Sequence, residues 1–400
     1  MRKLFKNILI FQSGEPTHFD KLHKPMRLVN LANSLIGKGH KVKVITSLFF
    51  HQEKKFRTVD QSCFYNNDQI EYNFIKSPGY KKNISITRII DHFFLAYNLS
   101  KKLKKLKNID LAIVGFPPIE TSYVLARWCK KMKIPYIVDF KDLWPELFIN
   151  NKNFFFKILI YPYYLLSSYL RNYVLMNSTH VSMISENFIQ NIPHKKKIVC
   201  YLTKKKTQNQ IIHINKKIKD IFLNTKKKKI IFIGNFMEDA YDFAILNKIK
   251  KYIIGSKKFE FHFFGEGPSK IKFMKILNFE NIFFHGRANS HEFDFILNKS
   301  SAVFLPIKNR FDYLRSVPNK VIDAIQYKLP IFTSLKGDTE KIINKYNIGY
   351  VYSNHEDLKY KLEKFFEYEF FIKISDNYNN KDIKSEFDHD LNYRKLLDKI

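Results

Sequence analysis

Cysteine is scarce in this chain, and its few residues are widely spaced. The 400 residues include three cysteines, Cys63, Cys129 and Cys200, and none belongs to a Cys-x-x-Cys pair. This spacing excludes a disulfide framework and a cysteine-based zinc site, and it fits a reducing, cytoplasmic compartment. No apolar stretch reaches the roughly 18 residues of a membrane-spanning helix. The apolar run Ile8–Phe11 is too short for the core of a signal peptide and is expected to be a strand.

Glycine is also rare, at 12 residues, and the common glycine-rich phosphate loops are missing. Gly14 is the only glycine in the loop after the first expected strand, so the G-x-G-x-x-G pattern of dinucleotide sites is absent. The sequence contains no G-x-x-x-x-G-K-[ST] motif either. We therefore expect neither a bound nicotinamide cofactor nor a P-loop nucleotide site. A lone glycine at this place still lets the backbone approach an anion closely.

Acidic side chains are few compared with basic ones. There are 37 Asp and Glu residues and 69 Lys and Arg residues, so the net charge is +32. This balance favours anionic partners such as an acidic membrane surface, a phosphorylated ligand or nucleic acid. An AT-rich genome would give the same Lys-, Asn-, Ile- and Phe-rich composition without any partner, and both interpretations stay open. Nucleic acid is not expected, because the basic residues are spread along the chain and no known binding motif occurs.

Short apolar runs alternate with helix-length segments in two series, which predicts two doubly wound α/β domains with parallel sheets. The first series contains strands at Ile8–Gln12, Lys41–Thr46, Leu111–Val114 and Tyr136–Asp139, with helices at Pro25–Gly39 and Ile119–Met132. The second contains strands at Lys229–Ile233, Phe259–Phe264, Ile282–His285, Ala302–Leu305 and Pro330–Thr333, with a helix at Pro318–Tyr327. We expect an N-terminal domain at 1–205, a lysine-rich linker at 206–228, a C-terminal domain at 229–375 and a tail at 376–400. One arrangement that we consider for this tail is packing back against the N-terminal domain.

Two segments between these series have open interpretations. Lysine runs at 195–197, 204–206 and 226–229 are expected to be solvated, with a dedicated binding patch as the alternative. The uncharged, tyrosine-rich run Ile158–Leu170 contains Pro162, which is expected to break or kink a helix. This run is interpreted either as a membrane-facing helix with interfacial tyrosines or as a helix packed under the N-terminal sheet.

Several motifs in order resemble a known family. They are GHKVKVIT, VDFKDLWPE, FIGNF, FFGEGPSK with FFHGR, and RSVPNKVIDAIQYKLPIF. Together, over roughly residues 7–355, they are similar to the retaining GT-B glycosyltransferases of the glycosyltransferase 4 class, especially bacterial surface-polysaccharide enzymes with a DLWPE-like motif. The resemblance implies two Rossmann-like domains facing a central cleft. Ligands of open α/β sheets bind at the carboxyl ends of the strands, so the loops there matter most.

The donor site is expected around the helix at Pro318–Tyr327. Ser316 is expected to cap this helix, whose N–H groups would face a nucleotide diphosphate with Arg315 and Lys320 nearby. The family has a ribose-binding Glu where this sequence has Asp323, and an acidic residue where it has Arg315. No cation follows the strand Lys229–Ile233, where the family has an Arg and a Lys. The residues expected to bind the donor are Gly14, Gly234, Arg287, Arg310, Ser316, Val317, Lys320 and Asp323.

The acceptor side is expected at the loop after Tyr136–Asp139. Asp142 and Glu146 are expected to bind acceptor hydroxyls, and Trp144 is expected to stack on a sugar or to anchor the loop. Asp142 and Arg315 are the candidate catalytic residues. Stabilisation of the leaving diphosphate matters more in this reaction than a strong base.

We therefore expect a retaining glycosyltransferase that moves a sugar from a nucleotide-sugar to a hydroxyl of a growing surface glycan. By resemblance, that glycan is lipid-linked, as in lipopolysaccharide O-antigen or capsule. No cofactor or metal is expected, since no metal-ligand cluster stands in the expected loops. The protein is expected to be cytoplasmic and peripheral on the inner face of an anionic membrane. The alternatives are a nucleotide-sugar epimerase of GT-B architecture and a non-catalytic nucleic-acid-binding protein.

Overall fold

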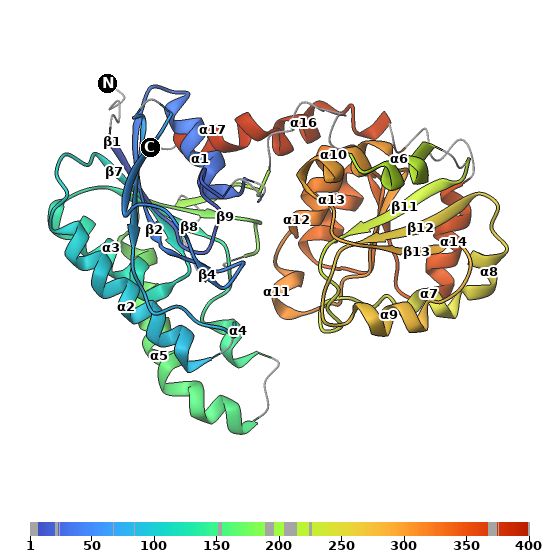
Figure 1. Cartoon of the computed structure of the whole chain (residues 1–400), viewed down its shortest axis with the longest axis horizontal. Helices are drawn as coiled ribbons and strands as arrows, with labels where there is room; N and C mark the ends of the chain where they lie inside the picture. The colour runs from blue at the N-terminus through green and yellow to red at the C-terminus, as the bar shows by residue number, and fades with distance from the viewer. Residues whose placement is uncertain are drawn as a thin grey trace. The chain divides into compact units, whose positions relative to one another are not determined.

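The computed structural model divides into two compact units. Unit 1 comprises Met1–Leu202 and Tyr393–Ile400, and unit 2 comprises Thr203–Asn392 (Figure 1). The structure describes residues 7–20, 23, 25–66, 68–83, 85–150, 154–188, 196–203, 214–223, 226–366, 374 and 376–398. The lysine run 204–206 and part of the expected linker, 206–213 and 224–225, lie outside the described residues.

Unit 1 is built on a sheet whose described strands run in the order β10-β9-β8-β7-β1-β2-β6-β5. All neighbours pair in parallel except β5 and β6, which pair antiparallel. The strands are β1 (Asn7–Phe11), β2 (Lys41–Ser47), β5 (Ser62–Tyr65), β6 (Ile70–Ile75), β7 (Leu111–Phe116), β8 (Tyr136–Phe140), β9 (His180–Met183) and β10 (Lys197–Val199). A separate antiparallel pair joins β3 (Phe49–Phe50) and β4 (Lys55–Phe56). The β7 run is buried throughout, as expected for a parallel strand covered on both faces.

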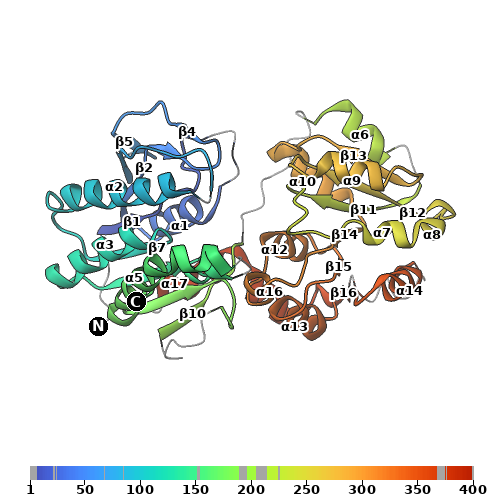
Figure 2. The same ribbon diagram turned by 90° about the horizontal axis from the view of Figure 1, so that it is seen from below.

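Helices cover both faces of this sheet. They are α1 (Arg27–Ile36), α2 (Ile86–Leu103), α3 (Ile119–Met132), α4 (Glu146–Ile149) and α5 (Phe154–Asn177). On one face, Leu28 and Leu35 of α1 share a core with Ile10 and Val44, and Tyr393 and Leu396 of the C-terminal helix join it. On the other, α2 and α5 both pack against α3, and the three helices lie side by side (Figures 1 and 2). This arrangement confirms the doubly wound prediction for the N-terminal half.

Unit 2 has a second parallel sheet, in the order β13-β12-β11-β14-β15-β16. Its strands are β11 (Lys228–Ile233), β12 (Phe259–Phe264), β13 (Ile282–His285), β14 (Ala302–Leu305), β15 (Ile331–Thr333) and β16 (Gly349–Val351). Its core is rich in phenylalanine: the ring of Phe243 lies 4.8 Å from Phe232, 5.3 Å from Phe263 and 5.0 Å from Phe273. Aromatic pairs at these separations add to the stability gained from burial.

The helices of unit 2 connect these strands. They are α6 (Lys216–Leu223), α7 (Ile245–Lys248), α8 (Lys250–Ile254), α9 (Lys270–Ile276), α10 (Ser290–Lys299), α11 (Phe311–Leu314), α12 (Asn319–Gln326), α13 (Asp338–Tyr346), α14 (His355–Phe365) and α16 (Lys381–Phe387). The last helix, α17 (His389–Asp398), begins in unit 2 and ends in unit 1. The predicted strands of the second series and its helix at Pro318–Tyr327 are all found, with shifts of one residue at some ends.

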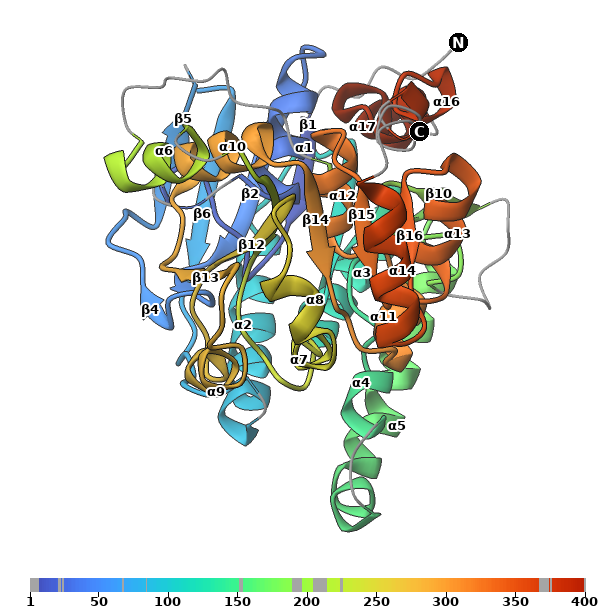
Figure 3. The same ribbon diagram turned by 90° about the vertical axis from the view of Figure 1, so that its right-hand side faces the viewer.

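The uncharged run 158–170 lies inside α5, which is not broken at Pro162. The first turns of α5 extend beyond the sheet of unit 1 (Figure 3). Large apolar side chains in these turns are exposed to solvent. Phe155 is 82% exposed, Leu159 78% and Tyr169 66%, whereas Val174 near the other end is buried. The alternative of a packed helix therefore holds only in part, because Tyr163 reaches buried Glu120 of α3 while these other side chains are exposed. No described helix is both long and apolar enough to cross a bilayer.

Candidate functional site

Three glycine-containing loops meet at the carboxyl ends of β11, β12 and β13 in unit 2. The backbone N–H of Gly234 donates to Phe264 O at 2.9 Å, and that of Gly265 donates to Gly286 O at 3.0 Å. A Cβ at Gly265 would lie 1.9 Å from Gly234 O, and one at Gly267 would lie 2.4 Å from Phe236 O. Both glycines also have positive φ angles, of 141° and 155°. Only glycine fits here, and the Gly265–Gly267 turn packs directly on the loop after β11.

Lys320 lies across the first of these loops. A Cβ at Gly234 would be 2.2 Å from Lys320 Cε and 2.7 Å from its Nζ, so the lysine fills the space that glycine leaves. Its ammonium lies 5.5 Å from the ring centres of both Phe232 and Tyr241. Within the described part of the chain, Lys320 makes no ion pair with a carboxylate. The cation that the sequence lacks directly after β11 is thus supplied from α12, about ninety positions later in the chain.

The N-terminus of α12 adjoins Lys320 and carries no side-chain cap. The N-cap residue is Pro318, and Ser316 Oγ donates instead to Tyr313 O at 3.5 Å, so the expected capping by Ser316 is wrong. Val317 is buried. Behind this turn, Thr339 Oγ1 donates to Ser316 O at 3.3 Å. A helix N-terminus without a side-chain cap retains N–H groups that favour an anion.

Asp323 and Arg315 lie on either side of this N-terminus along the chain. Asp323 is only 6% exposed, so it is not an ordinary solvated helix residue. The guanidinium of Arg315 stacks on the ring of Phe311 at 4.1 Å. The structure places Arg315 in unit 2 and the other candidate catalytic residue, Asp142, in unit 1.

The two remaining donor-side arginines differ in their surroundings. Arg310 contacts Asp312 at 3.1 Å and Asp239 at 3.2 Å, so carboxylates of unit 2 already engage its charge. Arg287, in the loop after β13, is exposed, and no ion pair forms between it and any described residue. Arg310 is consequently less suited to hold a diphosphate than Lys320 is.

The strand ends of unit 1 carry a buried chain of charges that the sequence analysis missed. Arg27 of α1 contacts Asp139 at 3.1 Å, Lys141 lies 3.6 Å from the same carboxylate, and Lys141 also pairs with Glu15. Glu15 Oε2 in turn accepts a 2.7 Å hydrogen bond from the backbone N–H of Leu28 at the start of α1. Burial would raise the pKa of the Asp139 carboxyl, but Arg27 and Lys141 hold it below its ordinary value.

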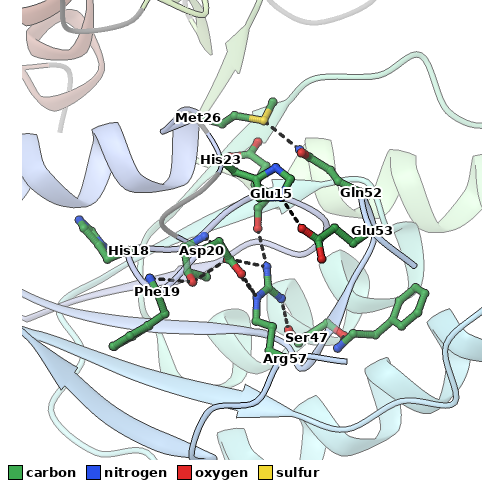
Figure 4. A network of polar contacts seen from close by, with 12 residues as sticks. Glu15, His18, Phe19, Asp20, His23, Met26, Ser47, Gln52, Glu53 and Arg57 are labelled. Atoms are coloured by element: carbon green, nitrogen blue, oxygen red, sulfur yellow. Dashed lines mark hydrogen bonds and ion pairs between the residues drawn. The ribbon is translucent and has the colours of Figure 1, made fainter. Parts of the chain in front are cut away.

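A second network fixes the loop that follows β1 (Figure 4). Arg57 contacts Asp20 at 3.0 Å and donates to Ser47 O at 2.7 Å and to Glu15 O at 3.0 Å. In the same loop, Gly14 has a φ of 81°, and a Cβ there would lie 3.7 Å from the Cβ of His51. The Gly14 loop is therefore held against the segment after β3 within unit 1, whereas the other predicted donor residues belong to unit 2.

The predicted acceptor residues are partly engaged inside unit 1. Trp144 is 7% exposed, and its ring centre lies 5.7 Å from that of His92 and 4.6 Å from that of Phe148. These contacts favour the alternative in which Trp144 anchors the loop. Glu146 forms an ion pair with Arg171 of α5. Asp142 is exposed at the end of β8. Of the three, Asp142 is the exposed residue.

No group of three or more His, Cys, Asp or Glu side chains suited to a metal ion occurs among the described residues. The expectation that no metal is needed remains a prediction. The cysteines Cys63, Cys129 and Cys200 are free thiols.

Part of the chain matches a known family. Residues 227–367, which lie within unit 2, match the family described as glycosyl transferases group 1. No curated protein sequence matches the chain significantly.

Solved structures share the fold over almost the whole chain. Sucrose-phosphate synthase from Thermosynechococcus elongatus superimposes with a TM-score of 0.71 at 10% identity, covering 98% of each chain. Anabaena HepE in complex with UDP gives a TM-score of 0.65 at 12% identity, again covering 98% of each chain. The lipopolysaccharide outer core galactosyltransferase WaaB gives 0.59 at 12% identity and the same coverage. The chain thus has the GT-B fold, and with the family match in unit 2 this supports a transferase enzyme.

Proposed function

We propose that this protein transfers a sugar from a nucleotide-sugar donor to a hydroxyl group of a glycan acceptor. The observation that carries the proposal is the position of Lys320. Its ammonium lies on Gly234, beside the N-terminus of α12 and the glycine loops after β12 and β13. A cation, a helix N-terminus and closely approachable backbone together suit a nucleotide diphosphate.

In this proposal the chain's own groups stabilise the leaving diphosphate. As the bond between sugar and phosphate breaks, negative charge grows on the phosphate oxygens, and Lys320 and the N–H groups of α12 are already oriented to receive it. Asp323 would accept hydrogen bonds from the ribose hydroxyls. Retention of the anomeric configuration is part of the proposal, because the resemblance implies it. Arg315 would then contact the sugar or a phosphate. Asp142, which belongs to unit 1, would bind a hydroxyl of the acceptor.

A uridine nucleotide is the first donor to test. Among the structures that share the fold, HepE was solved with UDP, and that protein's ligand motivates the choice. We propose a thermal-shift screen with UDP-, GDP-, dTDP- and CMP-sugars. A correct nucleotide at about 100 times its Kd stabilises the folded protein by roughly 2.7 kcal/mol. Stabilisation by none of these donors would contradict the proposal.

Product analysis separates transfer from the epimerase alternative. Incubation with the stabilising donor should yield a glycosylated acceptor and a free nucleoside diphosphate. An epimerase would instead release or interconvert the sugar without any acceptor product. The analysis should be made with and without candidate glycan acceptors, because hydrolysis of the donor alone would not establish transfer.

We further propose a lipid-linked surface-glycan acceptor, as in lipopolysaccharide O-antigen or capsule, and peripheral binding to an anionic membrane. The support is α5, on which Phe155, Leu159, Leu165 and Tyr169 are all exposed. The apolar contribution of these side chains does not depend on salt. The lysine-rich, +32 chain adds an attraction to anionic lipid that salt screens.

Sedimentation with anionic liposomes tests the membrane proposal. Wild-type protein should bind at low salt and retain part of that binding at high salt. The triple substitution Phe155→Ser, Leu159→Ser and Tyr169→Ser should remove the salt-resistant part without unfolding the protein, because all three side chains are exposed. Tyr163 is unsuitable for this test, since its hydroxyl donates a 2.6 Å hydrogen bond to buried Glu120.

A matched control uses exposed apolar residues of unit 2. Leu223, Ile271 and Tyr360 are 64%, 70% and 52% exposed, and their replacement by serine should leave liposome binding unchanged. An equal loss of salt-resistant liposome binding in the two triple variants would contradict a role for α5. So would the absence of liposome binding by the wild type at low salt.

A further inference from the structure

Two cations of unit 1 converge beside Tyr80. Lys54 Nζ donates to Asn83 Oδ1 at 2.6 Å and lies 4.6 Å from the ring centre of Tyr80. Arg88, in the first turn of α2, donates to Asn83 O at 2.8 Å and lies 5.4 Å from the same ring. The guanidinium of Arg88 also lies 4.6 Å from the ring of Trp144. Lys54, Arg88, Tyr80 and Trp144 thus form one cluster. Lys54 and Arg88 are 34 positions apart in the chain, and the fold brings them to one place.

His51 adds a hydrogen-bond donor to this cluster. Its Nδ1 accepts from the Tyr80 hydroxyl at 2.5 Å and from Lys54 Nζ at 2.9 Å. An acceptor at Nδ1 leaves the ring proton on Nε2. Burial, together with Lys54, Arg88 and His92, lowers the pKa of His51 to about 4, so the ring is neutral at neutral pH. His51 also lies against Gly14, at the strand ends where ligands of such sheets bind.

The nearby carboxylates have other partners. Asp91 accepts a 2.6 Å hydrogen bond from the backbone N–H of Gly79. Glu120 accepts from the Tyr163 hydroxyl and lies 3.5 Å from His92. Neither forms an ion pair with Lys54 or Arg88, and among the described residues no other carboxylate does. The Nε atom of Arg88 is buried and has no hydrogen-bond partner. Two adjacent cations with spare donors are the arrangement that a bound anion would stabilise.

The outer side of α2 is apolar. Ile86, Ile90, Phe93 and Tyr97 are 74%, 44%, 46% and 57% exposed and form one stripe along the helix. Ile86 and Ile90 flank Arg88 in the chain. Arg88 and Ile86 both lie in the first turn of α2. An anion site there, together with an apolar stripe that starts in the same turn, suits an amphiphile with a charged head group.

We propose that Lys54 and Arg88, with the Nε2–H of His51, bind a phosphate or diphosphate group carried by the acceptor. This inference rests on the proposed glycosyl transfer and adds the chemical class of the acceptor. The stripe on α2 favours a lipid phosphate over a soluble sugar phosphate as the source of that group.

Chemical labelling of Lys54 tests the site without any transfer reaction. Burial and the neighbouring Arg88 lower the pKa of Lys54 to about 8, so its amine should react readily with an acylating reagent at pH 8. Peptide mass spectrometry of the full chain should show that inorganic pyrophosphate slows this labelling at least fivefold. Lys130 of α3 is a matched control, because it too lies over a tyrosine ring, and its labelling should not change. The Lys320→Gln variant should show the same protection of Lys54, which excludes an effect transmitted from the donor site. Unprotected Lys54 would overturn the proposal.

Steady-state kinetics provide the second test. Lys54→Gln should raise the KM for a phosphate-bearing acceptor about tenfold or more, whereas the donor KM should not change. Arg88→Gln should have a similar effect and Arg88→Lys a smaller one, while Lys130→Gln should behave as wild type. An unchanged acceptor KM in a folded Lys54→Gln protein would also overturn the proposal. If the wild type neither binds nor turns over any nucleotide-sugar, the proposed function fails instead, whatever the labelling shows.

Two forms of the probe identify the source of the phosphate. Vesicles containing a polyprenyl phosphate should protect Lys54 at lower phosphate concentration than inorganic pyrophosphate does. Replacing Ile86, Ile90 and Phe93 by serine should abolish that advantage and leave protection by pyrophosphate intact. Equal protection by both probes would keep the phosphate site and assign it to a soluble acceptor.

Discussion

The charged side chains at the strand ends of the two units differ in how they are paired. In unit 1, Arg27, Asp139, Lys141 and Glu15 form a buried chain of alternating charges that neutralise one another. In unit 2, Lys320 rests on a glycine and two aromatic rings, and no described carboxylate pairs with it. The difference indicates that this buried chain of unit 1 positions the backbone, whereas Lys320 of unit 2 is available to a ligand.

The buried chain in unit 1 should be the more sensitive to substitution. Arg27→Ala removes the closer of the two cations that pair with buried Asp139, and it also removes the hydrogen bonds from Arg27 to Cys200 O at 2.8 Å and Tyr201 O at 3.1 Å. We expect the free energy of unfolding to fall by about 3–5 kcal/mol. Chemical denaturation measures this loss. Lys38→Ala breaks only the exposed pair with Asp398, so it should lower the free energy of unfolding far less. An equal loss of stability in both variants would contradict a special role for the buried chain.

Asp323 should give the next largest effect, on ligand binding. Asp323→Ala removes a carboxylate that we expect to accept ribose hydroxyls, and donor affinity should fall by about 1.5–3 kcal/mol. A titration of the nucleotide-sugar measures this change, with denaturation to establish that the variant is folded. Asp312→Ala serves as control, because Asp312 pairs with Arg310. Unchanged donor affinity in a folded Asp323→Ala protein would rule out the ribose role.

Arg310 should give the smallest effect, since carboxylates of its own unit already engage it. Arg310→Ala breaks the partly exposed pairs with Asp312 and Asp239, which are worth about 0–1 kcal/mol in total stability. Donor affinity should change by no more than about threefold. A loss as large as that from Asp323→Ala would show that Arg310 leaves its carboxylate partners for the ligand, and the comparison between engaged and available cations would have to be redrawn.

The sequence predicts much of the fold because apolar runs and their spacing are local signals. The strands at Phe259–Phe264 and Ala302–Leu305 and the helix Ile119–Met132 are found with the predicted ends. Helix α2 was not predicted, since apolar residues occur on both its inner and outer sides and blur the helical period.

The candidate site is harder to predict because its contacts join distant positions. The sequence shows no cation after β11, yet the fold brings Lys320 onto Gly234. It likewise assembles Lys54 with Arg88, and Arg27 with Asp139, from segments that carry no shared motif. Glu146 resembles a ligand residue in sequence, but Arg171 of α5 engages its carboxylate, a pairing that no local pattern reveals.

Calorimetric titration of UDP, GDP and dTDP into the wild type and into Lys320→Gln tests the central claim most directly. The account predicts that one nucleoside diphosphate binds the wild type and that the substitution weakens this binding by about 10- to 100-fold, because a charged hydrogen bond to phosphate is lost. Lys308→Gln, an exposed lysine of the same unit, should bind as the wild type does. Equal affinity in wild type and Lys320→Gln, or no binding of any nucleoside diphosphate, would contradict the account.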